Sequence, residues 1–160
     1  MNWIKFILAA LAVFIVQYLL VGVLSIRLIR PDFIAIFVLY AGLKHGRPVG
    51  ITSGFMLGLL VDLAGVGSYF GLTSLICTIT GYLAGTLKHY HDKMLPYIFH
   101  LSWILIFCLH FLIFTYVRYQ TLFESDLGIF WMKWLLTASY SFVFLGIINY
   151  FFPLRDSARA

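Results

Sequence analysis

Residues 50–62 read GITSGFMLGLLVD, and this stretch decides the fold. Gly50, Gly54, Gly58 and Asp62 recur at every fourth position. Because each residue turns an α-helix by about 100°, these positions lie almost above one another and form one ridge along the helix. The glycines of the ridge have no side chain, whereas the residues between them are mostly large and apolar. Such a helix offers a flat groove to another backbone, which is a common packing device in membranes.

The composition predicts an all-α integral membrane protein. The chain has 160 residues, of which 62% are hydrophobic and only 11% are charged. This is too apolar for a soluble domain, and about 20 residues per crossing leave room for five or six helices. The net charge of +5 fits the Lys/Arg excess that orients membrane proteins, so we expect no nucleic-acid partner. The interpretation is a single transmembrane domain over residues 1–160.

Helix-ending signals divide the chain into six apolar segments. A Lys-His-Gly sequence at 44–46 ends the second segment and Pro48 opens the third, which predicts a very tight antiparallel turn. Residues 88–93 form the most polar loop, and Ser125 or Asp126 is the expected N-cap of the last segment. The predicted spans are approximately residues 3–24, 31–44, 48–63, 69–87, 95–117 and 127–152.

The fourth segment, residues 69–87, carries a small-residue face of its own. Two consecutive helices with such faces should pack on each other, so residues 48–87 are predicted to form a hairpin core. The same faces could instead receive a partner helix, and the spacing leaves both readings open. The candidate residues for helix packing or partner binding are Gly50, Gly54, Gly58, Asp62, Gly71, Gly81 and Gly85.

Charged residues gather near one predicted end of the second and third segments. Asp62 is a candidate functional residue, because ionisable side chains inside a membrane are rare and costly. We expect it to pair with Arg30 or to cap the turn at Gly65–Gly67. Pro31 suits a first helical turn, and Asp32 beside it complements the positive end of a helix. The predicted outer-side polar cluster is Arg30, Asp32 and Asp62.

The basic residues indicate the orientation of the six spans. The loops after the second and fourth spans lie on the same side as both ends of the chain, and this side carries most of the 11 Lys and Arg residues. The positive-inside rule therefore places both termini in the cytoplasm, in a multi-pass plasma-membrane protein. The basic residues on this side are Lys5, Lys44, Arg47, Lys88, Lys93, Arg155 and Arg159.

No group of residues in the sequence indicates catalysis. His89 and His91 lie in the polar loop, where we expect a solvated pair rather than a metal site. An aspartyl mechanism would need two facing carboxylates, and only Asp62 is even partly embedded. We therefore expect a non-enzyme with no cofactor and no metal. Three polar side chains inside spans, Gln17, His100 and His110, are each expected to hydrogen-bond to a neighbouring helix.

The order of short motifs resembles that of a known family. Arg30-Pro31-Asp32-Phe33 opens a short apolar helix, Gly54-x-x-x-Gly58-Leu-Leu-x-Asp62-Leu follows, and Gly71-Leu and Gly81-Tyr-Leu come next. This ordered set is similar to that of the bacterial rod shape-determining protein MreD. The specific similarity covers residues 30–87, whereas length and six-span topology fit over the whole chain and the last two spans match only in kind.

The resemblance implies a non-catalytic scaffold of the cell-elongation machinery in the bacterial inner membrane. Its implied partners are an MreC-like single-span protein, a RodA-type glycosyltransferase with its transpeptidase, membrane lipid and, indirectly, an MreB-like filament. It would help to position peptidoglycan synthases for cell-shape control. The family is also thought to be distantly related to the substrate-binding subunits of energy-coupling-factor transporters. The alternative is therefore a small-molecule-binding subunit of a transporter, and the oligomeric state stays open.

Overall fold

The computed structural model describes residues 3–24, 31–65 and 69–154, and this part of the chain is helical with no strand. The all-α class is thereby confirmed. Six helices are long, and two short ones lie in the connections. They are α1 (Trp3–Leu24), α2 (Phe33–His45), α3 (Arg47–Leu63), α4 (Leu72–Tyr90), the 3-10 helix η1 (His91–Lys93), α5 (Pro96–Arg118), α6 (Gln120–Ser125) and α7 (Leu127–Phe151).

Several helix ends follow from local chemistry. Asp32 is the N-cap of α2, and its carboxylate accepts a hydrogen bond from the backbone N–H of Ala35 at 2.8 Å. Gly46, at φ 86°, ends α2 and begins α3, with Pro48 in the first turn. Asp126 is the N-cap of α7 and accepts from two backbone N–H groups. The predicted tight turn and the predicted N-cap at Asp126 are confirmed.

Other boundaries differ from the prediction. Pro31 lies before the N-cap rather than in the first turn, so α2 begins at Phe33. Helix α4 begins at Leu72 instead of residue 69, because Gly71 adopts a left-handed conformation with φ 86°. The predicted loop between the last two long helices contains α6.

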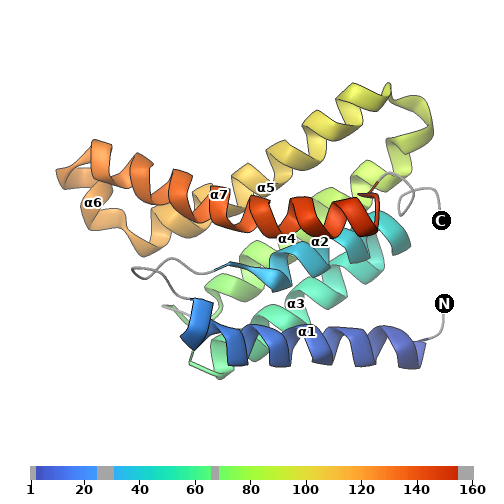
Figure 1. Ribbon diagram of the computed structural model, residues 1–160, viewed down its shortest axis with the longest axis horizontal. Coiled ribbons are helices and arrows are strands. Elements are labelled where there is room, and N and C mark those ends of the chain that lie inside the picture. Colours follow the sequence, from blue (N-terminus) through green and yellow to red (C-terminus); the bar gives the residue numbers. More distant parts are fainter. Residues whose placement is uncertain (1–2, 25–30, 66–68, 155–160) are drawn as a thin grey trace.

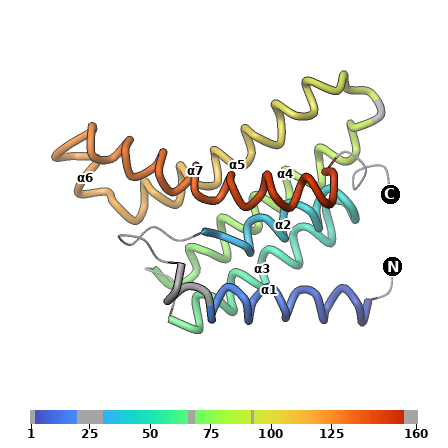
Figure 2. Tube along the Cα trace, viewed as in Figure 1, coloured from blue at the N-terminus to red at the C-terminus, as the bar shows by residue number. Residues whose placement is uncertain are grey.

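An antiparallel hairpin of α3 and α4 forms the middle of the molecule, and α2 packs against both (Figure 1). Helix α1 contacts α2 and α3, α5 contacts α4, and α7 contacts α5. The start of α1 and the end of α7 lie at the same end of the helical assembly, whereas α6 lies at the opposite end (Figure 2). Helix α2 is thus flanked by α1 on one side and α7 on the other.

Two apolar clusters fill the spaces between these helices. The larger one joins α2, α4, α5 and α7, and the smaller one joins α2, α3 and α4 with side chains of α1 packed against it. By length and composition, α5 and α7 are the two helices in the described residues that could cross a membrane. The fully buried large side chains include Phe99, Phe107, Phe111, Phe130, Leu39, Leu43, Ile76 and Leu145.

Candidate functional site

The glycine ridge of α3 lies directly against the backbone of α4. A Cβ atom added at Gly54 would lie 2.7 Å from the carbonyl carbon of Cys77, and one added at Gly58 would lie 2.7 Å from the backbone nitrogen of Ser74. Ordinary contacts begin at 3.4 Å, so the two helices are closer than any side chain on the ridge would allow. The facing pairs are Gly50 with Gly81, Gly54 with Cys77, and Gly58 with Ser74.

Helix α2 joins this seam through Gly42, a residue that the sequence analysis missed. A Cβ atom at Gly42 would lie 2.7 Å from the Cβ of Ala84 and 2.8 Å from the carbonyl oxygen of Gly81. One at Gly50 would lie 2.9 Å from the Cα of Gly42. Helices α2, α3 and α4 therefore meet at Gly42, Gly50 and Gly81, whose lack of side chains lets the three backbones come into contact. Gly42 and Gly46 lie four residues apart, as the ridge glycines do, and this spacing could have indicated that Gly42 belongs to the seam. The indication is weak because Gly46 is also the residue expected to end the helix.

The two remaining candidate glycines have different surroundings. Gly85 lies on the seam, because a Cβ atom there would meet the backbone of Gly46 and Arg47. Gly71 lies apart from it: the residue precedes α4, and no heavy atom of the described residues lies within 4 Å of a Cβ added there. Its left-handed backbone, rather than close packing, is what requires glycine at this position.

Asp62, at the end of α3, caps the neighbouring helix α4. Its Oδ2 accepts a hydrogen bond from the backbone N–H of Ser74 at 3.1 Å. The first turn of a helix has free N–H groups, and the N-cap residue Gly71 has no side chain that could accept from them. Asp62 supplies this acceptor and a negative charge at the positive end of the helix. Asp62 is 7% exposed, and among the described residues its Oδ1 has no hydrogen-bond partner.

Most of the partners predicted for Asp62 lie outside the described residues, including residues 66 and 67 of the turn. In the predicted turn, the N–H of Gly65 bonds to the backbone carbonyl of Asp62 at 3.3 Å, not to its carboxylate. Arg30 lies outside the described residues. Asp32, the third member of the predicted outer-side cluster, has a different set of partners from Asp62.

Asp32 belongs to a polar network that ties four helices together. His110 on α5 places Nε2 at 3.4 Å from Asp32 Oδ2, and its Nδ1 at 2.8 Å from Oγ1 of Thr80 on α4. The backbone N–H of Asp32 donates to Oγ of Ser141 on α7 at 3.2 Å. Thr80 Oγ1 also lies 2.9 Å from the carbonyl oxygen of Ile76, so the hydroxyl has two neighbours for its one hydrogen.

In this network an acid contacts a histidine and the histidine contacts a hydroxyl. Enzymes that activate a hydroxyl nucleophile use the same order of groups. Here the hydroxyl is enclosed, because Thr80 is 2% exposed and His110 is 3% exposed. Both side chains lie between packed helices, away from the molecular surface. The arrangement therefore satisfies buried polar groups and holds α2, α4, α5 and α7 in register.

The other polar predictions had mixed outcomes. His110 does hydrogen-bond to neighbouring helices, and Gln17 binds the start of α2 by donating to Pro31 O at 3.1 Å and accepting from Phe33 N at 2.9 Å. The prediction for His100 is wrong, since its Nδ1 accepts from Trp103 Nε1 on the same helix.

The polar loop after α4 also differs from the expected solvated pair. His89 is exposed, but His91 is 8% exposed and its ring packs edge-on against Phe99 at 5.0 Å between centroids. Within residues 3–24, 31–65 and 69–154, no three His, Cys, Asp or Glu side chains are grouped as metal ligands.

Comparison with protein families identifies a relationship that covers almost the whole chain. The family model described as rod shape-determining protein MreD matches residues 1–154. The match confirms the predicted resemblance and extends it beyond the motifs between residues 30 and 87. No curated protein and no solved structure matches the chain.

Proposed function

Because the chain belongs to the MreD family of rod shape-determining membrane proteins, we propose that it is a non-catalytic scaffold of the bacterial cell-elongation machinery. The match over residues 1–154 is the observation that carries this proposal. The partners we propose are an MreC-like single-span protein and a RodA-type glycosyltransferase with its transpeptidase. An MreB-like filament would be reached indirectly, so that peptidoglycan synthases are positioned along the cell wall.

The helix packing supports a scaffold role. A platform needs a rigid body, and the side-chain-free contact of α2, α3 and α4 leaves no room for sliding without a clash. The polar network around His110 adds directional bonds between α2, α4, α5 and α7. We propose that the seam glycines serve packing within the protein, because α4 already fills the groove that a partner helix would need.

We place the docking face for a partner helix on the outward side of α7. Val143 on this side is 59% exposed, and Gly146 is exposed with no heavy atom within 4 Å of a Cβ added there. In a membrane, association depends on close packing, and an exposed glycine lets a second backbone approach. This face of α7 is therefore better suited to a partner helix than the exposed face of α5, where large leucine side chains suit contact with lipid.

We propose six membrane crossings with both termini in the cytoplasm of the inner membrane. The excess of Lys and Arg on the side of the two termini supports this orientation. The placement of the start of α1 and the end of α7 at one end of the molecule is compatible with an even number of crossings (Figure 1). Reporter fusions at each terminus test it, and a periplasmic signal at either end contradicts it.

Purification in a mild detergent, followed by identification of the bound proteins, tests the function. We expect a single-span protein with a periplasmic domain and a transpeptidase. Gly146→Leu should reduce their recovery, whereas Leu105→Phe, which adds bulk at a 68% exposed position of α5, should not. Equal recovery for both variants contradicts the docking face. A paired ATPase and a bound vitamin-sized molecule would contradict the scaffold and favour a transporter subunit.

A further inference from the structure

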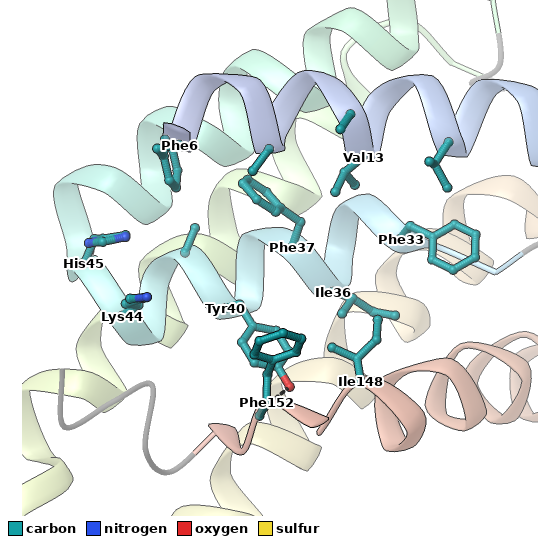
Figure 3. A pocket seen from close by; sticks show the side chains of 14 residues that line it. Phe6, Val13, Phe33, Ile36, Phe37, Tyr40, Lys44, His45, Ile148 and Phe152 are labelled. Carbon is teal, nitrogen blue, oxygen red and sulfur yellow. Dashed lines mark hydrogen bonds between the residues drawn. The ribbon is translucent and has the colours of Figure 1, made fainter. Parts of the chain in front are cut away.

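A groove of about 540 Å³ runs along α2 between α1 and α7, apart from the seam and the polar network (Figure 3). Phe37 and Tyr40 of α2 lie along its floor, Val13 lies on the α1 side, and Ile148 and Phe152 lie on the α7 side. The lining is almost entirely apolar. The volume falls within the range of about 300–1,000 Å³ that is typical of ligand sites.

The length of the groove matches one leaflet of a bilayer. It extends along α2 from Phe33 to Lys44, which is about 17 Å at 1.5 Å per residue. The hydrocarbon core of a bilayer is about 30 Å thick, so the groove covers roughly half of it. An occupant that enters at the Lys44 end would reach about the midplane.

The lining of the groove suits a flexible hydrocarbon chain. Its walls are aromatic and aliphatic from Phe6 and Val13 on the α1 side to Ile148 on the α7 side, so a lipid tail would contact apolar groups along most of its length.

One end of the groove is basic. Lys44 is exposed and His45 is half-buried, and both line the groove there. The Lys88 ammonium donates to the carbonyl oxygen of Lys44, which brings a further cation to this end. Among the side chains that the structure describes, no carboxylate forms an ion pair with any of these three groups. Phe6 of α1 packs edge-on against the His45 ring, with centroids 5.5 Å apart, and so fixes its position.

We propose that this groove binds an anionic phospholipid, with one acyl chain along α2 and the phosphate at Lys44 and His45. Basic pockets between helices on the cytoplasmic side are suited to anionic lipid head groups. The apolar floor alone would accept any lipid tail. The Lys44 and Lys88 ammonium groups at its end select an anionic head group over a zwitterionic one, and the bound lipid would fill the space between α1 and α7.

Photo-cross-linking of the full chain in phosphatidylcholine vesicles tests the proposal. The probe is phosphatidylglycerol with a photoreactive group in its acyl chain, and a phosphatidylcholine probe with the same chain is the comparison. We expect the anionic probe to label peptides of α1, α2 and α7 preferentially. Lys44→Gln should lower this labelling roughly fivefold, as expected for one cation at a membrane surface, while labelling by phosphatidylcholine stays the same. Lys93→Gln, at an exposed position of η1, is the control and should change neither.

A second pair of variants separates the groove from the rest of the surface. Ala12→Trp adds a large side chain to the α1 wall of the groove and should abolish labelling there. Leu135→Trp places the same side chain at an exposed position of α7 outside the groove and should not. Equal labelling by the two lipids, or full labelling of Ala12→Trp with unchanged thermal stability, overturns the proposal. A protein that cross-links in the groove in native membranes, in place of the lipid, also overturns it.

Discussion

Replacing Gly54 with alanine should destabilise the protein, because the added methyl group has no space in the seam. Its Cβ would lie 2.7 Å from the carbonyl carbon of Cys77, whereas ordinary contacts begin at 3.4 Å. The opposing atoms are backbone atoms and cannot rotate away, so α3 and α4 must separate along the seam. Overpacking of this kind costs about 1–3 kcal/mol, and the rigid neighbours place Gly54→Ala at the upper end. The higher helix propensity of alanine offsets about 1 kcal/mol, which leaves a net loss of about 2 kcal/mol.

Equilibrium unfolding in mixed micelles, followed by the fluorescence of the four tryptophans, measures this loss. Gly146→Ala is the matched control, since it makes the same change within helix α7 where no heavy atom lies within 4 Å of the new Cβ. There we expect no loss and a gain of up to about 1 kcal/mol. If the two variants unfold with the same free energy, the seam does not pack as described.

Three further predictions use the same unfolding measurement. Asp62→Ala should lower the free energy of unfolding by about 1–3 kcal/mol, because it leaves a buried backbone N–H of α4 without a partner. Asp126→Ala should lower it less, because the groups that Asp126 caps are exposed and can bond to water. Equal free energies of unfolding for the two variants would show that Asp62 has no special role. His110→Ala should lower the free energy of unfolding by about 2–4 kcal/mol, because it removes hydrogen bonds and leaves a cavity. His100→Ala, at an exposed position, should lower it by less than about 1 kcal/mol. A larger loss for His100→Ala than for His110→Ala would refute the network. Gln17→Leu should lower the free energy of unfolding by about 1–3 kcal/mol, because two backbone groups at the start of α2 lose their hydrogen-bond partner. An unchanged free energy of unfolding would show that Gln17 does not fix α2 against α1.

Features that depend on neighbours in the sequence could be predicted well. The four-residue spacing of Gly50, Gly54 and Gly58 identifies the flat face of α3, because helical periodicity is a local property. Gly46 and Asp126 mark helix ends by the chemistry of a residue and the few that follow it. In each case, the residues that determine the structure lie within one or two turns of one another.

Features that depend on what lies across a helix interface could not be predicted. The partner of Asp62 is a backbone N–H, and a backbone N–H has no sequence signal of its own. His100 and His110 look alike in the sequence, but one bonds to its own helix and the other reaches α4 and α2. Gly42 reads as a residue near a helix end, and its role is visible only when α2 is seen against Gly50 and Gly81.

Solid-state NMR of the protein in lipid bilayers, with ¹³C only at its glycines, tests the central claim without any substitution. Gly42, Gly50 and Gly81 lie on three different helices and should give cross-peaks with one another, because their backbones meet in the seam. Cross-peaks within single helices, with none linking α2, α3 and α4, would contradict the seam and the rigid platform built on it.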